Sequence, residues 1–529
     1  MPDEIIPNQT PNTPSPLTQS AKELIGVFTA PDEESSESVT GSMKVSTAAT
    51  LPALFYEKIR NIIEYHEDHL LRRAAIERIL ERLVRSKNST RIIAENLIRE
   101  LLWARYLKNE TVPLSKIDEV DKIIQKYQKL HPLSKEQVDW IRSVESYDIE
   151  RKLVETYKKE SMVSFMYQVF SPQIKLESSF SEEEKNIQIF IACHKALAHS
   201  DEAILRYFLF HLRYPELKEE LTQEVLDNFS TIYQKIESQI NNPANTILTR
   251  HLRRNIAPFL FLEDALRKNS KIETYEKPDT LEAQITEVTN KRYSELKSKI
   301  TRMATRSIIY VFITKMLVAL LFEIPSDLWI TKDFKIVSLM INISFPPAMM
   351  FILTLSVKSP KSDNTTKVIK RIKTMLYQTE EEKNKNPIFI SLKPREHGQI
   401  LTVFLTTIYL LAFIVSFGII LKVLGILSFS ILSRVVFILF LSGIAFFAYQ
   451  IRQVAKDYTV SDKEGILAPV ADFFMVPILS LGQWVSKGLS RFNFLTFIFD
   501  FIIEAPLKNI IEVFEELTHF LKEKREEVV

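Results

Sequence analysis

Glycine is scarce in this sequence. The 529 residues contain only 9 glycines, and none lies between Gly41 and Gly398. Tight hairpin turns depend on glycine, and so do phosphate-binding loops of the G-x-x-x-x-G-K-[ST] and G-x-G-x-x-G types. The absence excludes a nucleotide site built on such a loop over residues 51–397, and it predicts that this stretch is almost wholly helical.

Cysteine is scarcer still, because Cys193 is the only one. A single thiol excludes an intrachain disulfide and also excludes zinc sites that need several thiolates. We expect Cys193 to be a buried, inert side chain, and the lack of disulfides fits a reducing, cytoplasmic side for the soluble part. No cofactor is predicted.

Net charge is also small, since 68 basic residues face 66 acidic ones and leave +2. This balance gives no argument for a nucleic-acid partner. The useful information lies in how charge and apolarity are distributed along the chain. Residues 1–50 are rich in Pro, Ser, Thr, Asp and Glu and have little apolar surface to bury, so we predict a disordered N-terminal tail.

The next part of the chain has a clear helical periodicity. Over residues 51–300 apolar side chains recur mostly at spacings of three and four. Side chains that can cap the helix that follows stand at Ser89, Ser115, Ser134, Ser181 and Asp201. We therefore predict a helical domain over 51–300.

Four long apolar runs follow this domain. They cover about 304–323, 336–357, 400–421 and 428–449, and the second and third carry no charge across 22 residues. Because a spanning helix needs ~20 apolar residues, residues 301–450 are predicted to form a membrane domain with four spans. A basic loop at 358–399 separates the second run from the third.

Basic residues between the runs predict the orientation. Lys and Arg cluster before the first run, after the second and after the fourth, whereas the other two connections carry few. Basic loops stay in the cytoplasm, so we predict a multi-pass protein of the plasma or inner membrane with both termini cytoplasmic. The fold class is all-α, with a cytoplasmic helical domain, a four-helix transmembrane region and an amphipathic C-terminal helix.

Charged side chains inside the apolar runs are candidates for function. Lys315 lies in the first run and Arg434 in the fourth. Charges within a span usually face protein or water rather than lipid, and they can mark a permeation path. The alternative for Lys315 is structural, namely snorkelling or pairing inside the bundle with Asp500 or Glu504.

Polar and helix-breaking residues also interrupt the second run. Pro346 and Pro347 follow Asn342 and remove two backbone donors. Broken helices bind ions in transporters, which makes this stretch a candidate site. Kinks at proline are also common in ordinary spans, and that is the structural alternative.

An amphipathic segment, TTKVIKRIKTMLY at 365–377, lies in the basic loop. Apolar residues share one face, and the other faces carry Lys367, Lys370, Arg371 and Lys373. The pattern predicts a helix that lies on a bilayer with anionic headgroups. A merely solvated basic helix is the alternative.

The C-terminal region, 451–529, contains a segment almost apolar enough to span a membrane, FNFLTFIFDFIIEAPLKNII at 492–511. Its polar residues recur once per helical turn, and Asp500, Glu504 and Lys508 belong to that stripe. Because a span would not keep a stripe of acids, we predict an amphipathic helix at the inner membrane surface or over the inner ends of the spans. The stretch 465–484 is a similar interfacial or re-entrant candidate.

His66 and His69 are weak candidates for a metal site. They lie three residues apart among acidic side chains, but their spacing matches neither H-E-x-x-H nor the E-x-x-H of di-iron bundles. Solvated helix surface is the alternative.

Taken together, these features predict a membrane-anchored interaction or scaffold protein. Its helical domain carries no catalytic pattern and would bind another protein or a second copy of this chain. One alternative is a transporter or channel component that uses Lys315, Asn342 and the kink at Pro346 and Pro347. A second is a metal-dependent, membrane-tethered enzyme, although catalysis is not the preferred prediction.

Overall fold

A computed structural model describes part of the chain in detail. The described residues are 16–30, 41–45, 70–86, 88–130, 134–177, 180–214, 223–331, 336–355, 362–378, 387–391, 399–460, 475–485, 513 and 520. The structure is 82% helical and 2% strand, so it is mostly α-helical, as predicted. It divides into two compact units, the first drawn from 1–26, 172–178 and 253–491 and the second from 27–171, 179–252 and 492–529.

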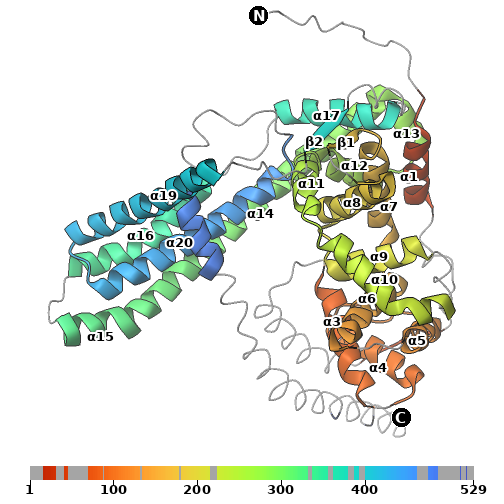
Figure 1. Ribbon diagram of the computed structural model, residues 1–529, viewed down its shortest axis with the longest axis horizontal. Coiled ribbons are helices and arrows are strands. Elements are labelled where there is room, and N and C mark those ends of the chain that lie inside the picture. The colour runs from red at the N-terminus through yellow and green to blue at the C-terminus, as the bar shows by residue number, and fades with distance from the viewer. Residues whose placement is uncertain are drawn as a thin grey trace, which may run out of the picture. The chain divides into compact units, whose positions relative to one another are not determined.

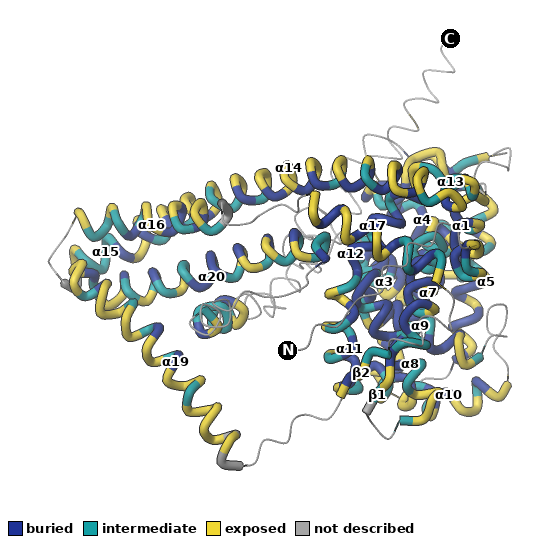
Figure 2. The backbone as a smooth tube through the Cα atoms, turned by 90° about the horizontal axis from the view of Figure 1, so that it is seen from above, coloured by how far each residue is buried: buried dark blue, intermediate teal, exposed yellow. Residues whose placement is uncertain are grey.

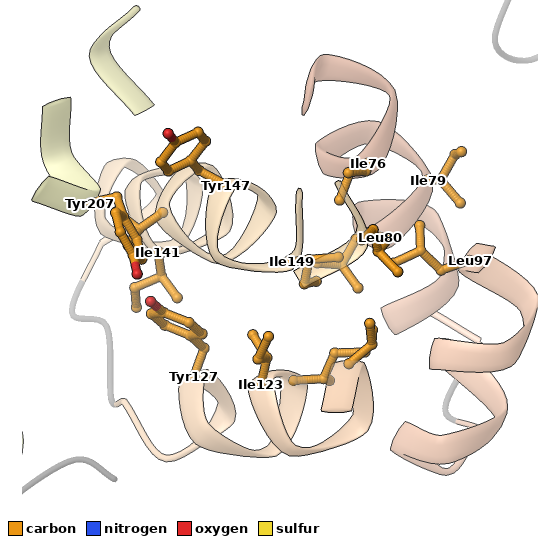
Figure 3. Close-up of a cluster of buried hydrophobic side chains, with 14 of the residues drawn as sticks. Ile76, Ile79, Leu80, Leu97, Ile123, Tyr127, Ile141, Tyr147, Ile149 and Tyr207 are labelled. Atoms are coloured by element: carbon orange, nitrogen blue, oxygen red, sulfur yellow. The ribbon is translucent and has the colours of Figure 1, made fainter. Parts of the chain in front are cut away.

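The second unit is built from helices (Figure 1). They are α3 (Leu71–Val84), α4 (Thr90–Trp103), α5 (Ser115–Gln128), α6 (Lys135–Leu153), α7 (Tyr157–Phe170), α8 (Glu182–Cys193), the π-helical η2 (His194–Ala198), α9 (Glu202–Arg213), α10 (Gln223–Ile240) and α11 (Ala244–Arg253). α6 packs against α3, α5 and α9. Figure 3 shows Ile76, Leu97, Ile123 and Ile149 of four different helices directed into one apolar core, which includes α6.

Side-chain caps fix where several of these helices begin. Four of the five predicted caps are confirmed, because Ser89, Ser134, Ser181 and Asp201 each accept a hydrogen bond from the backbone N–H three residues later. Such a bond satisfies an otherwise unpaired helix donor. Ser115 differs, because it is the first residue of α5 rather than its cap.

The first unit combines a small head with the apolar helices. The head contains most of α1 (Gln19–Thr29), β1 (Ile174–Glu177), α12 (Ala257–Lys268), α13 (Ile272–Glu276), the start of α14 (Pro278–Val318), α17 (Ser362–Tyr377) and β2 (Ile388–Ser391). The apolar part contains the rest of α14, η4 (Ala319–Glu323), α15 (Ile324–Ser326), η5 (Asp327–Thr331), α16 (Ile336–Leu355), α19 (Gln399–Ile426), α20 (Ile431–Lys456) and the helix Met475–Val485.

Four helical stretches in the described part of the chain are long and apolar enough to cross a membrane. They are Pro278–Trp329, Ile336–Leu353, Val403–Ile426 and Ile431–Lys456, which confirms the four predicted runs as helices of that kind. Figure 2 shows many exposed residues along these stretches, and large apolar side chains are among the exposed ones in their apolar parts, as expected where lipid replaces water. In the most apolar part of α19 only 11% of the residues are buried, against 33% in α20, so α19 lies at the edge of the group of apolar helices.

α14 joins the head to the first apolar run. It is 41 residues long, and its first half packs against α12, α13 and α17. The predicted domain boundary at residue 300 therefore lies inside a continuous helix, which Figure 2 shows as one rod. The head and the first span share one backbone without a linker.

The two strands depart from the prediction of an almost wholly helical stretch. β1 and β2 pair in parallel, with Ile174 opposite Ile388 and Glu177 opposite Ser391. Parallel strands are joined by long crossovers rather than tight turns. Scarce glycine therefore argues against hairpins but leaves such a pair allowed.

α1 corrects the prediction of disorder throughout residues 1–50. Ala21, Leu24 and Ile25 are at most 3% exposed, and the Thr18 N–H donates to the Leu376 carbonyl of α17 at 2.9 Å. A short apolar helix within a polar tail is ordered here because its apolar side has a protein surface to cover. Apart from 16–30 and 41–45, the predicted tail lies outside the described residues.

Candidate functional site

A buried ion pair lies among the apolar helices of the first unit. Lys315 Nζ donates to Glu323 Oε1 at 2.5 Å, and Asn342 Nδ2 donates to Glu323 Oε2 at 2.5 Å. Lys315 and Glu323 are 0% exposed and Asn342 is 1% exposed. We call these three residues the membrane triad. It brings together two of the predicted candidates, Lys315 and Asn342, around Glu323, which was not among the predicted site residues.

A π-helical turn explains how Lys315 reaches Glu323. In an ideal α-helix, eight residues at about 100° each overshoot two full turns by about 80°, so the two side chains would point in different directions. η4 (Ala319–Glu323) lies between them, and its wider turn rotates the chain less per residue. The π turn therefore brings the carboxylate back toward the face of Lys315.

The triad also involves α20 through an aromatic ring. Lys315 Nζ lies 5.2 Å from the centroid of the Phe440 ring, a cation–π distance. The lysine and glutamate charges cancel, and both carboxylate oxygens accept hydrogen bonds. Asn342 Oδ1 is the exception, because it is buried and has no hydrogen-bond partner in the described part of the structure.

The partner of Lys315 differs from the residues considered for it. Its counter-ion is Glu323, eight residues along the same chain segment. Asp500 and Glu504, together with Lys508 of the same polar stripe, lie outside the described residues. Lys315 is thus paired with a carboxylate among the apolar helices.

Pro346 and Pro347 lie in the middle of α16 without breaking it. The helix runs from Ile336 to Leu355 through both prolines, and both ring systems are buried. A transporter-type broken helix is therefore absent from this described span. Proline has no backbone N–H, so the carbonyls of Asn342 and Ile343, four residues before the two prolines, lose their helical donors. Asn342 also supplies the side-chain amide of the membrane triad.

Arg434 closes the turn between α19 and α20. Its Nε donates to the Phe429 carbonyl at 2.9 Å. Its guanidinium lies close to Gly425, where an added Cβ would be 3.7 Å away from it. Ser338 Oγ of α16 donates to the neighbouring Leu427 carbonyl at 2.7 Å. Arg434 therefore satisfies backbone at the end of the hairpin and does not join the membrane triad.

α17 differs from the predicted helix with its apolar face on a bilayer. Val368, Ile372 and Leu376 are fully buried, because α17 packs on α12 and α14. The basic side chains lie on the remaining faces. Lys367, Lys370 and Arg371 are exposed, whereas Lys373 Nζ donates to Glu282 Oε2 of α14 at 2.8 Å.

The two predicted metal candidates are histidines near the start of the predicted helical domain. His66 and His69 lie outside the described residues. Within the ranges that the structure describes, no group of three His, Cys, Asp or Glu side chains is positioned to hold a metal ion.

A second buried polar cluster, missed in the sequence, surrounds α6 in the second unit. Lys126 Nζ and the Tyr127 hydroxyl donate to Asp148 Oδ2 at 2.5 and 3.1 Å. Glu145 lies 3.3 Å from Arg142, and burial raises the pKa of its carboxyl to about 8. Acidic residues are normally assigned to helix surface, so the pattern gave no signal that α6 is buried on several sides.

A polar cavity of about 630 Å³ also lies in the second unit, beside the start of α9. Its lining charges are mostly paired with one another. Arg73 binds Glu77 and Asp201, the latter at 2.7 Å, and Arg206 binds Glu202 at 3.0 Å. Because these cations and anions compensate each other, the cavity shows no preference for a ligand of one charge.

Comparison with known proteins gives no relative. No protein-family model matches the chain, and no curated protein or solved structure matches it.

Proposed function

We propose that this protein is a membrane-anchored interaction or scaffold protein that presents its helical parts on the cytoplasmic side of the membrane. The observation that carries the proposal is α14, which packs the head with its first half and becomes an apolar span in its second half. A binding platform needs a defined position relative to the bilayer. A continuous helix supplies this directly, because no flexible linker separates the head from the span.

A second link supports the same function. After α20, residues 457–460 return to the head, where Asn364 of α17 holds them. Asn364 Nδ2 donates to the Tyr458 carbonyl at 2.9 Å and to the Tyr293 hydroxyl at 2.7 Å, and its Oδ1 accepts from the Val460 N–H at 2.7 Å. The first and fourth spans are thus both tied to the head, which favours a rigid connection between the head and the spans.

Interaction is best tested by photo-crosslinking in native membranes. Photoreactive residues would replace Ile92, Val138 and Leu212, which are exposed apolar side chains of the second unit at 46, 40 and 57%. The proposal expects at least one position to give a discrete adduct, with a partner or with a second copy. Exposed polar positions Glu81 and Lys135 serve as matched controls. Adducts that are equally diffuse at all five positions contradict the proposal.

Orientation is tested separately by cysteine labelling. Trp329, 81% exposed after the first span, and Lys291, exposed on α14, lie on opposite sides of the first apolar run. Because basic segments stay in the cytoplasm, a cysteine at 329 should react with an impermeant maleimide on intact cells, and one at 291 only after permeabilisation. The reverse pattern overturns the cytoplasmic placement. Native Cys193 is buried and should stay unlabelled.

A transporter or channel component is the second candidate, and the membrane triad is the observation that favours it. Ionisable residues inside a span often mark an ion or proton path. The burial of Lys315, Glu323 and Asn342 counts against an open path, because a path needs access from water. Flux in proteoliposomes with Lys315→Leu as the control decides the matter: absent flux, or flux unchanged in the variant, eliminates this candidate.

The third candidate, a metal-dependent membrane-tethered enzyme, depends on His66 and His69 alone and gains no support from the described residues. Elemental analysis of the purified protein tests it. A preparation without bound transition metal removes it.

A further inference from the structure

The level at which the first unit meets lipid can be located on two helices. On α14, exposed large apolar side chains begin at Ile309 and Tyr310, which are 53 and 64% exposed. On α20, the last such side chain is Tyr449, at 46%. α14 and α20 pack together in one apolar cluster, so these two levels mark one surface of the membrane.

Basic residues lie just on the head side of that level on both helices. Lys299, Arg302 and Arg306 follow one another on α14 at spacings of three and four, so they share one face. Arg452 lies three residues beyond Tyr449 on α20. All four side chains are exposed. We call these four residues the basic collar.

The collar has no acidic partners in the part of the chain that the structure describes. Arg302 donates to the Ser298 hydroxyl at 2.7 Å, and no carboxylate binds any of the four residues there. The acids nearest along the two helices are engaged elsewhere, since Glu295 pairs with Arg292 and Asp457 with Arg253. Among the residues that the structure describes, the collar therefore presents uncompensated positive charge.

Distance along α14 separates the collar from the basic face of α17. At about 1.5 Å per residue, Arg306 and Arg302 lie about 5 and 10 Å from the level of Ile309. α17 runs antiparallel to α14, because Asn364 contacts Tyr293 and Lys373 contacts Glu282. Those contact levels lie about 24 and 40 Å from Ile309.

Screening then decides which basic residues can sense the membrane. The Debye length is about 8 Å at physiological ionic strength, so charges tens of ångströms from the surface are screened. Arg306 and Arg452 lie within one Debye length of that level, and Arg302 lies slightly beyond it. Lys299, about 15 Å away, lies at about two Debye lengths. The basic side chains of α17 lie well beyond it.

We propose that the basic collar binds the anionic headgroups of the bilayer in which the protein sits, and that the basic face of α17 does not. The collar carries three arginines, and a guanidinium binds phosphate oxygens through paired N–H donors. Each basic residue near an anionic surface contributes an attraction equivalent to roughly fivefold in lipid preference. The inference goes beyond the scaffold function and holds whichever partner the head binds.

The test measures lipid retention by the full-length protein. The protein is purified from nanodiscs that contain phosphatidylcholine with phosphatidylserine, and retained lipids are counted by native mass spectrometry. Wild type should retain phosphatidylserine preferentially. The variant R302Q/R306Q/R452Q should lose that preference by at least tenfold, and the charge-preserving R302K/R306K/R452K should keep most of it.

The control variant is K370Q/R371Q, which removes two exposed charges from α17 and should leave lipid preference unchanged. Equal losses in the control and collar variants overturn the proposal, as does full retention of phosphatidylserine by R302Q/R306Q/R452Q. Inorganic phosphate distinguishes the ligand source. If it displaces the lipid at moderate concentration, the collar is a site for free anions and the proposal is wrong.

Discussion

At the scale of single residues, the membrane triad shows how a charge is tolerated between apolar helices. Neither Lys315 nor Glu323 contacts water, and each supplies the other's counter-charge. A paired buried charge is tolerable, but an unpaired one costs several kcal/mol because its desolvation is not offset. The triad is therefore more sensitive to loss of one member than to loss of the pair.

This asymmetry predicts a specific double-mutant cycle. Lys315→Met and Glu323→Gln should each destabilise the protein by ~3–5 kcal/mol, and the double variant should cost clearly less than their sum. Denaturant unfolding in detergent micelles measures the three free energies. Lys422→Met on α19, where the lysine is exposed, is the matched control and should change stability little. Additive single effects would show that the pair is not coupled.

Glu145 in α6 gives the second unit a pH-dependent stability. Burial raises the pKa of Glu145 from its ordinary value of 4.5 to about 8, against the opposing field of Arg142. Burial likewise raises the pKa of Glu150 to about 7, against Arg72 and Arg73. Between pH 4.5 and these values the folded state holds protons that the unfolded state has released, so stability falls as pH rises through that window.

The expected loss is up to about 1.4 kcal/mol per pH unit for each proton by which the two states differ. Glu145→Gln should flatten the upper part of the slope, and exposed Glu81→Gln should not. Unfolding monitored by fluorescence of buried Trp103 and Trp140, with Trp329 and Trp484 replaced by Phe, reports on the second unit. Stability that rises with pH across this window would contradict the assignment.

At the scale of elements, the helix Met475–Val485 is too short to cross a bilayer. Its 11 residues span about 17 Å, whereas the hydrocarbon core is about 30 Å thick. It meets α20 at Ser442 and Phe446, near the middle of that helix's apolar stretch. A short helix that contacts the centre of a span favours a re-entrant over a surface position, the two possibilities raised by the sequence.

Gly482 permits this approach, which predicts the effect of adding one methyl group. A Cβ at position 482 would overlap the Ser442 carbonyl and lie 2.8 Å from Phe446 Cβ. Gly482→Ala should therefore displace the short helix, at a cost of ~1–3 kcal/mol. Hydrogen exchange over 475–485 should quicken. Gly443→Ala is the control, because nothing lies within 4 Å of a Cβ there; unchanged exchange in Gly482→Ala would refute the contact.

Some elements could be predicted from sequence and others could not, for physical reasons. The apolar runs and the caps at Ser89 and Asp201 are local signals, and the structure confirms them. The partner of Lys315 depends on a π turn, which side-chain periodicity does not reveal. β1 and β2 pair across more than two hundred residues, and α17 covers its apolar face with protein, so neither outcome is encoded in the segment itself.

At the scale of the first unit, α14 determines how the head relates to the spans. Residues 297–306 lie between the head and the level at which exposed apolar side chains begin. They carry basic, small polar and apolar side chains and no proline or glycine. Such a sequence maintains a helix without breaks. Any tilt of the span in the bilayer is then transmitted to the head, which makes the orientation of a bound partner depend on the membrane.

Spin labels on this helix test its rigidity in the whole protein. Labels at exposed Glu287 and Tyr310 are 23 residues apart, so pulsed electron resonance in nanodiscs should give one narrow distance near 35 Å, from about 1.5 Å per residue. Ser298→Pro lies between them and would clash with the carbonyl four residues earlier, so the distribution should broaden. Ser298→Ala keeps the helix and should keep the distance. A broad distribution in wild type would mean that the head moves independently of the span. That result would contradict the rigid connection on which the scaffold proposal depends.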